Sequence, residues 1–235
     1  MNEALQKAKL AKKAASGLAQ LSTDVKDKAL GMMAQALEEQ AGYLMKANKL
    51  DVEAAVQSGK AKAFIDRLTL TEKRIKDMAD GLRVIQNLQD PVGETVAMWK
   101  RPNGLRIGQR RVPLGVIGII YESRPNVTAD AAGLCLKAGN AVILRGGSEA
   151  IQSNKAIVKV LSQAAYEAGI PEGAIQLIED TGRDSARQLM RLNGLVDVLI
   201  PRGGPSLIKA VIEEATVPVI ETGVGNCHVY VDSEC

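Results

Sequence analysis

Two glycine-rich turns carry the residues whose types and spacing could bind a phosphate. The first follows the apolar run AVILR and reads Arg145-Gly146-Gly147-Ser148-Glu149. Two glycines let the backbone come close to a ligand, and a helix that starts after such a turn offers free N–H groups and a partial positive charge. Arg145 adds a full charge and a fork of donors. The same residues also fit an ordinary strand-to-helix turn with a solvated arginine, and the pentapeptide alone does not separate the two readings.

A second turn of the same kind lies in PRGGPS, at residues 201–206. It again joins the end of an apolar run to the start of a helix. Neither turn is followed by the Gly-Lys-Ser/Thr of a Walker loop, and neither contains the dinucleotide fingerprint GxGxxG. Composition alone therefore favours two ordinary turns, and a cofactor role needs further support.

The elements that must position the first turn alternate between strand and helix. Residues 115–120, GVIGII, form an apolar run between Pro113 and the polar YESRPN, which favours a buried strand. Residues 127–137 have helical composition up to the stop at Gly139, AVILR is a second buried strand, and a second helix runs to about Ala168. This order predicts a right-handed parallel crossover, whose ligands bind beyond the carboxyl ends of the strands.

The same alternation continues along the rest of the chain. Strands of this kind, separated by short helices, predict an α/β fold with a doubly wound, mostly parallel sheet over residues 114–235. We expect the further strands at residues 174–178, 196–200, 217–220 and 228–231, and the helices at residues 184–192 and 207–215.

The N-terminal segment, residues 1–90, is almost free of strand signals and predicts helices packed on the α/β domain. Residues 91–113 then alternate apolar and polar side chains around Asn103-Gly104, which is a strong hairpin signal. Trp99, the only tryptophan, is expected to pack on one face of this hairpin. The helices of the N-terminal segment are expected around residues 5–14, at 25–45 and 48–58, and up to Leu88, before Pro91.

Composition agrees with a globular protein and excludes several classes of partner. The net charge of +3 is too small to imply binding to nucleic acid or to a membrane. No apolar run approaches about 20 residues, and the N-terminus lacks the apolar core of a signal peptide. The three cysteines have no metal-ligand spacing, so we expect free thiols, no metal and a cytoplasmic protein.

Four stretches together resemble one known family. They are RPNGLRIG at residues 101–108, the long run from RRVPLGVIGII to LRGGSEA at 110–150, PRGGPSLI at 201–208 and ETGVGNCHVYVD at 221–232. They resemble the gamma-glutamyl phosphate reductases, or glutamate-5-semialdehyde dehydrogenases, of the aldehyde dehydrogenase superfamily. The family's chain is much longer, and the segment that carries its nucleophilic cysteine is absent here. We therefore expect a chain truncated before the catalytic domain and inactive alone.

The resemblance implies an aldehyde dehydrogenase-like, Rossmann-like cofactor domain and an oxidoreductase reaction. The family uses NADPH to reduce L-glutamyl 5-phosphate to L-glutamate 5-semialdehyde plus phosphate, in proline biosynthesis. Turns that match the two glycine turns lie at the cofactor in the superfamily. The implied cofactor-binding residues are Arg145, Gly146, Gly147, Ser148, Gly203, Gly204 and Ser206, with Arg202 as a charge partner.

The preference for NADPH depends on the register of the first turn. Relatives that use NAD often place a glutamate there, which binds the ribose hydroxyls and repels a 2′-phosphate. The matching residue in this chain is Ser148, which is neutral, and Arg145 can pair with the phosphate. If the alignment shifts by one residue, Glu149 takes the ribose position and the preference reverses.

The resemblance also implies catalytic roles for residues outside the glycine turns. Asn126 matches the region whose asparagine stabilises the oxyanion, although the alignment can shift to Ser123 and a loop-capping role is equally open. Glu221 matches a glutamate that acts as a general base in relatives, but this reduction needs no water, so its role is an orienting one. Cys227 lies beside His228, the only histidine, yet we expect it to be a buried structural cysteine, like Cys135.

Two other functions stay open from the sequence. The missing cysteine segment is compatible with a non-catalytic nucleotide-binding or interaction module, and an acyl-CoA-reducing relative would share the fold. The hairpin at residues 91–113 matches a ribbon that takes part in subunit contacts in relatives, so the resemblance implies a homo-oligomer.

Overall fold

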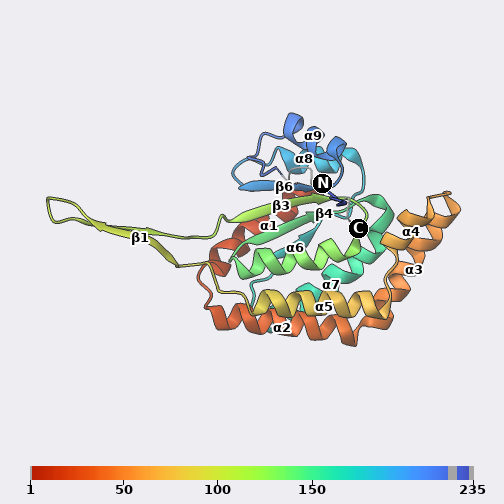
Figure 1. Ribbon diagram of the computed structural model, residues 1–235, viewed down its shortest axis with the longest axis horizontal. Helices are drawn as coiled ribbons and strands as arrows, with labels where there is room; N and C mark the ends of the chain where they lie inside the picture. Colours follow the sequence, from red (N-terminus) through yellow and green to blue (C-terminus); the bar gives the residue numbers. More distant parts are fainter. Residues whose placement is uncertain (1, 222–226, 233–235) are drawn as a thin grey trace.

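A parallel sheet lies at the centre of the computed structural model, which describes residues 2–221 and 227–232 (Figure 1). The strand order is β5-β4-β3-β6, and β3 pairs in parallel with both β4 and β6. The chain therefore winds outward from β3 in one direction and returns to its other side, which confirms the predicted doubly wound α/β class. The strands are β3 (Val116–Tyr121), β4 (Ala141–Arg145), β5 (Ile175–Leu177) and β6 (Val198–Arg202).

Helices cover both faces of this sheet, because its central strands are apolar on both faces. All six residues of β3 are buried, as expected for a central parallel strand. In β4, Val142 and Leu144 belong to one core, whereas Ala141 and Ile143 belong to the other. The first core is shared with α2 (Thr23–Glu39), α5 (Glu72–Gln86), α6 (Pro125–Lys137) and α7 (Ile151–Glu167), and the second with α1 (Glu3–Leu18), α8 (Arg183–Met190) and α9 (Pro205–Glu214).

The N-terminal helices differ from the sequence expectation in number and in bounds. The helix expected at residues 25–45 is interrupted at Gln40, which ends α2 and precedes α3 (Ala41–Gln57). The helix expected at 48–58 is the second half of α3, and α4 (Lys62–Leu68) was not expected. A contact distant in sequence holds α4 in place, since the buried Asn48 amide donates to the Leu68 carbonyl and accepts from Leu70 N–H. None of the helices in residues 2–221 is long and apolar enough to cross a membrane.

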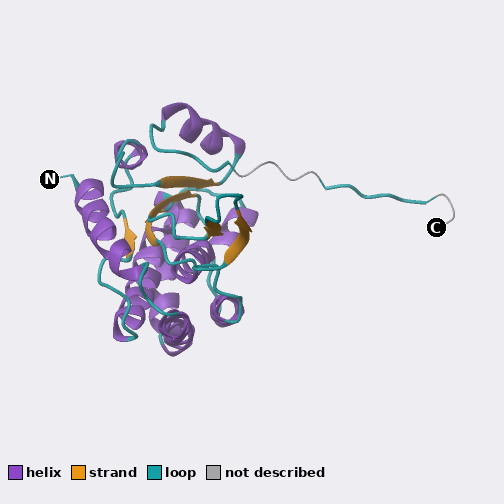
Figure 2. Cartoon of the chain, turned by 90° about the vertical axis from the view of Figure 1, so that its left-hand side faces the viewer, coloured by secondary structure: helices purple, strands orange, loops and turns teal. Residues whose placement is uncertain are grey.

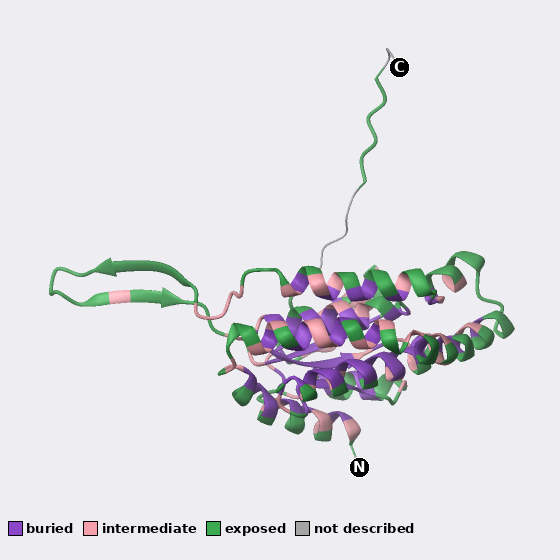
Figure 3. Ribbon diagram, turned by 90° about the horizontal axis from the view of Figure 1, so that it is seen from below, coloured by how far each residue is buried: buried purple, intermediate pink, exposed green. Residues whose placement is uncertain are grey.

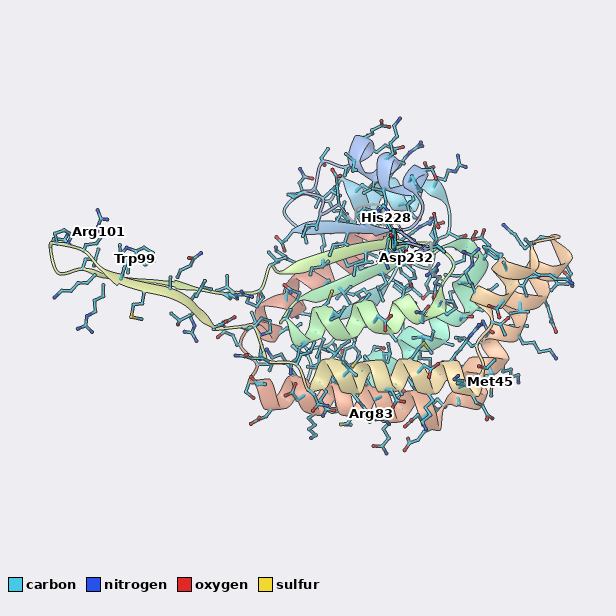
Figure 4. The ribbon with its side chains drawn as sticks, viewed as in Figure 1. Met45, Arg83, Trp99, Arg101, His228 and Asp232 are labelled. Atoms are coloured by element: carbon cyan, nitrogen blue, oxygen red, sulfur yellow. The ribbon has the colours of Figure 1, made fainter. Side chains whose placement is uncertain are left out.

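A two-stranded ribbon projects from the body of the molecule (Figure 1). It consists of β1 (Thr95–Lys100) and β2 (Arg106–Arg110), with Trp99 opposite Ile107. The turn between them has Gly104 at a positive φ of 87°, a conformation that glycine adopts without steric cost. Every residue of β1 is exposed, and Trp99 and Arg101 extend from the ribbon away from the helices (Figures 3 and 4).

Two of the expected strands are not formed as strands. At residues 217–220 only Val219 makes a bridge, to Leu199 of β6. Residues 228–231 have no regular structure and are exposed, so the strand expected there was wrong (Figure 2). An extended segment becomes a strand only when a neighbour completes its hydrogen bonds, and no described strand lies beside these residues.

Candidate functional site

The two glycine turns lie on opposite sides of the end of β3, because β3 is the strand between β4 and β6. The loop that leaves β3 contacts both of them. The Ser123 hydroxyl donates to Glu149 Oε2 at 3.0 Å, and the Gly204 N–H donates to Glu122 Oε1 at 3.0 Å. Residues predicted separately from two motifs therefore form one continuous edge at the carboxyl ends of the strands.

The glycines of the first turn are required by packing within the chain. A Cβ atom at Gly146 would lie 2.2 Å from Asn154 Nδ2 and 3.1 Å from the Tyr121 ring. A Cβ atom at Gly147 would lie 2.9 Å from the Ser123 hydroxyl oxygen. Any larger residue would push these buried groups aside. The space that the two glycines leave, which we expected a ligand to use, is thus filled by side chains of the protein itself.

Arg145 is held along the turn and is not the freely solvated arginine of the alternative reading. Its Nη2 donates to the carbonyl oxygens of Thr181 and Gly182, at 2.7 and 3.1 Å. Its Nε is buried and has no hydrogen-bond partner in the described part of the chain. Burial lowers the pKa of the guanidinium. The side chain is therefore fixed by the loop after β5, and its buried Nε donor is unused.

Glu149 is turned toward the body of the protein, whereas Ser148 is exposed. The Glu149 carboxylate accepts from Ser123 and forms an ion pair with Lys60 at 3.1 Å. Burial raises the pKa of the Glu149 carboxyl, but the hydrogen bonds from its own backbone N–H, from Lys60 and from Ser123 outweigh it, and the pKa lies below its ordinary value. Both residues belong to a short 3₁₀ helix, Ser148–Ala150, which leads into α7.

Lys60 is a site residue that the sequence did not reveal. It precedes α4 and reaches the turn from 89 residues earlier in the chain. No local pattern marks it, because it is one of many lysines in the N-terminal segment. It places a second cation beside the one that Arg145 supplies.

The second turn is occupied by a carboxylate of the chain itself. A Cβ atom at Gly203 would lie 2.7 Å from the Glu122 carboxyl carbon, so only glycine leaves room for that side chain. Glu122 accepts from Gly204 N–H, at the start of α9. A phosphate bound at this helix end would have to displace Glu122. Ser206 and Arg202 are exposed beside it.

The two candidates for the oxyanion position are distinguished by their contacts. Ser123 is buried and donates its hydroxyl to Glu149. Asn126 is exposed in the first turn of α6 and lines two cavities. Asn126 is therefore the one that is open to a ligand. Glu221 is exposed and has no hydrogen bond or ion pair with any of the described residues.

The cysteines are not arranged as nucleophiles in the described residues. Cys135 is buried in the core, as expected, and burial raises the pKa of its thiol to about 12. Cys227 is exposed beside an exposed His228, so the expected burial of Cys227 was wrong. The reason is the absence of a strand at residues 228–231, which leaves nothing to cover this segment. Cys235 lies outside the described residues.

Comparison with known proteins identifies the family. The sequence profile of the aldehyde dehydrogenase family matches residues 1–233. The chain belongs to the aldehyde dehydrogenase family. It is 62% identical to the gamma-glutamyl phosphate reductase of Clostridium botulinum, over 100% of this chain and 56% of the relative. It is 64% identical to the same enzyme of Heliobacterium modesticaldum, over 97% of this chain and 55% of the relative. This aldehyde dehydrogenase family chain thus spans just over half the length of these relatives.

Solved structures of the family give the same result. The gamma-glutamyl phosphate reductase of Thermotoga maritima superposes with a TM-score of 0.94 at 47% identity, over 98% of this chain and 56% of that one. The enzyme of Saccharomyces cerevisiae gives 0.86 at 31% identity, over 94% of this chain and 56% of that one. An acetylating aldehyde dehydrogenase of Geobacillus thermoglucosidasius, with a TM-score of 0.72 at 24% identity over 95% of this chain and 46% of that one, shows the shared fold alone.

Aldehyde dehydrogenases use NAD or NADP, and the two turns differ in how well they fit such a cofactor. At the first turn, Arg145 has an unused buried donor and Glu149 is already paired, so a phosphate group fits there. At the second turn, the helix end already holds the Glu122 carboxylate. The first turn is therefore the better supported phosphate site.

Proposed function

We propose that this chain is the cofactor-binding portion of an NADPH-dependent gamma-glutamyl phosphate reductase. The enzyme would convert L-glutamyl 5-phosphate into L-glutamate 5-semialdehyde and phosphate, a step of proline biosynthesis. The observation that carries the proposal is that the two glycine turns lie on either side of the end of β3, and that Asn126 lines one cavity with Gly203 and Gly204 of the second turn. The names of the relatives and the close superposition on the Thermotoga maritima structure support the proposal.

Each site residue has a physical role in this reaction. The bound cofactor supplies a hydride. Arg145 and the turn that follows it hold the cofactor's phosphate and so fix its position relative to the substrate. Asn126 donates a hydrogen bond to the carbonyl oxygen of the substrate as negative charge develops on it. Glu221 has an orienting role. The covalent nucleophile is supplied from outside the described residues.

Binding of NADPH to the purified chain is the direct test of this proposal. Isothermal titration should give saturable binding of NADPH that is tighter than that of NADH, because an additional phosphate meets Arg145. A chain that binds neither nucleotide would refute the proposal and would favour a non-catalytic interaction module.

Ser148→Glu is expected to weaken NADPH binding more than NADH binding. The added carboxylate would stand at the position that binds the ribose in NAD-using relatives and would repel a 2′-phosphate. Arg145→Ala should act in the same direction, by about 1.5–3 kcal/mol, which is typical of a lost charged hydrogen bond. The measurement is a titration of both cofactors with each variant.

A matched control is Gln20→Glu, which adds the same charge at an exposed position between α1 and α2. It should leave both affinities unchanged. If Ser148→Glu weakened the binding of NADPH and NADH equally, or if the wild type bound NADH more tightly than NADPH, this turn would not be the site that recognises the 2′-phosphate.

We further infer that the ribbon of β1 and β2 forms a contact between copies of the chain. Val96, Met98 and Trp99 are 50%, 69% and 44% exposed on a ribbon that stands away from its own core. Met98→Glu should therefore convert an oligomer into a monomer, because it places a charge in an apolar contact. Light scattering after gel filtration measures the mass directly.

Val84→Glu is the control, since Val84 is 63% exposed on α5 and away from the ribbon. It should leave the mass unchanged. A wild-type chain that is monomeric at all concentrations would contradict the inference.

A further inference from the structure

A cavity of about 820 Å³ lies between α6 and one face of the sheet. Its floor is apolar, with Ile117 and Ile119 from β3 and Ile200 from β6. Its polar lining consists of Arg67, Glu122, Arg124, Asn126, Asp130, Asn140 and Arg202. A cavity with an apolar interior and a few polar groups at one end is typical of a small-molecule site.

The wall of this cavity is one face of α6. Asn126, Asp130 and Leu134 line it at a spacing of four residues, which places them above one another on the helix surface. With a rise of about 1.5 Å per residue, Asp130 lies about 6 Å further along the helix than Asn126. That separation matches the distance between the 5-carbonyl group and the α-amino group of a five-carbon amino acid.

Asp130 is a carboxylate without a partner. It is half-buried and makes no hydrogen bond or ion pair with any described residue. The carboxylate lies beside Gly81 of α5, where an added Cβ atom would lie 3.6 Å from Asp130 Oδ1. Burial raises the pKa of the Asp130 carboxyl. Partial removal of a carboxylate from water costs free energy unless a cation pairs with it. The cavity therefore favours a ligand that places a positive group beside Asp130.

Two arginines that line the same cavity lack an anionic partner in the described part of the chain. The Arg124 side chain has no partner in the described residues, and Arg67 bonds only the Ala63 carbonyl, through Nε. Both also line a smaller cavity of about 300 Å³ beside the start of α6. Arg74, which lines this smaller cavity too, is already paired with Asp66. The lining of the larger cavity therefore presents, with Arg67 and Arg124, two guanidinium groups that are able to bind a carboxylate.

We propose that this cavity recognises the amino-acid end of the substrate, with Asp130 pairing with the α-ammonium group and Arg67 and Arg124 pairing with the α-carboxylate. The ligand class is a 2-amino dicarboxylate or its 5-substituted derivative. The inference rests on the proposed function, which supplies the five-carbon amino acid and places its reacting carbonyl at Asn126. None of the three charged residues belongs to the glycine turns, so they determine substrate choice without holding the cofactor.

The test compares L-glutamate with glutarate, which keeps both carboxylates and lacks only the amino group. Titration of the isotope-labelled chain, followed by NMR, should give binding of L-glutamate at least about tenfold tighter than that of glutarate, as expected for one charged hydrogen bond. Asp130→Asn should remove this difference and leave glutarate binding unchanged. Arg124→Ala should weaken both ligands. Asp24→Asn, at an exposed carboxylate on α2 that lines neither cavity, is the matched control and should change neither.

Three results would overturn the assignment: equal affinity of the wild type for the two ligands, equal weakening of both by Asp130→Asn, or no binding of either. A separate titration with NADPH distinguishes this failure from failure of the proposed function. Normal NADPH binding without selection for the amino group would reject the amino-acid subsite alone. Selection for L-glutamate that Asp130→Asn abolishes would support the subsite, whatever the cofactor result.

Discussion

The purified 235-residue chain is expected to bind NADPH and yet to leave gamma-glutamyl phosphate unreduced. Reduction through a covalent acyl intermediate needs a thiolate at the site, and neither described cysteine supplies one. Cys135 is buried with a thiol pKa of about 12, so at neutral pH it is protonated as well as inaccessible. Cys227 is exposed, on an extended segment that leads away from the body of the molecule (Figure 2). Without a nucleophile the intermediate does not form, and turnover should fall by several orders of magnitude.

The measurement is NADPH consumption by the chain in the presence of gamma-glutamyl phosphate, with the Thermotoga maritima enzyme as the positive control. The reverse reaction, oxidation of the semialdehyde in the presence of phosphate, should also show no turnover. Turnover that disappears in a Cys227→Ser variant would mean that this thiol is the nucleophile. The variant itself should fold and bind NADPH normally, because Cys227 is exposed.

The parts of the fold that the sequence predicts well are those fixed by local patterns. GVIGII and AVILR are apolar on both faces, which only a central strand of a covered sheet requires, and both are strands in the structure. The glycine turns were recognised because glycines end an apolar run and begin a helix. The resemblance then gave the family, which the comparison confirms.

The parts that the sequence could not predict depend on contacts between distant residues. Glu149 meets Lys60, and Glu122 meets Gly204, across 89 and 82 residues. Neither pair has a local signature, although each decides what its turn can bind. At residues 228–231 the local pattern is present and the distant partner is missing. Their alternation predicts a strand, but a strand also needs a neighbouring strand to complete its hydrogen bonds. The sequence does not single out Asp130, because an acidic residue on a helix is normally solvated. Only packing shows that its carboxylate is half-buried and has no partner among the described residues.

The same reasoning applies to stability, where the largest single effect is expected from an ion pair that joins α2 to the segment before the ribbon. The Lys26 side chain is 1% exposed and its partner Asp90 is 9% exposed. Asp90 also accepts from Thr23 Oγ1 at 2.8 Å and from Val92 N–H at 2.9 Å. Burial raises the pKa of the Asp90 carboxyl, but the hydrogen bonds from Lys26, Val92 and Thr23 outweigh it, and the pKa is lowered. This carboxylate therefore fixes the base of the ribbon on the helical layer.

Lys26→Met is expected to destabilise the fold by about 3–5 kcal/mol, because it leaves the buried Asp90 carboxylate without its cation. For a chain of this size that corresponds to a loss of roughly 6–20 °C in melting temperature. Lys28→Met, at an exposed lysine two residues along the same helix, should change stability by less than about 0.5 kcal/mol. The double variant Lys26→Met/Asp90→Leu should recover most of the loss, since an apolar pair needs no compensation.

The pH dependence gives an independent check on the same pair. Because the folded-state pKa of Asp90 is below its unfolded value, its stabilisation is fully present above about pH 4 and is lost as the pH falls through the lower, folded-state pKa. The difference in unfolding free energy between the wild type and Lys26→Met should therefore be constant near neutral pH and shrink in acid. Denaturant unfolding at a series of pH values measures it. A difference that is small at neutral pH, or a double variant no more stable than Lys26→Met, would show that the Lys26 ammonium is not what compensates the buried carboxylate.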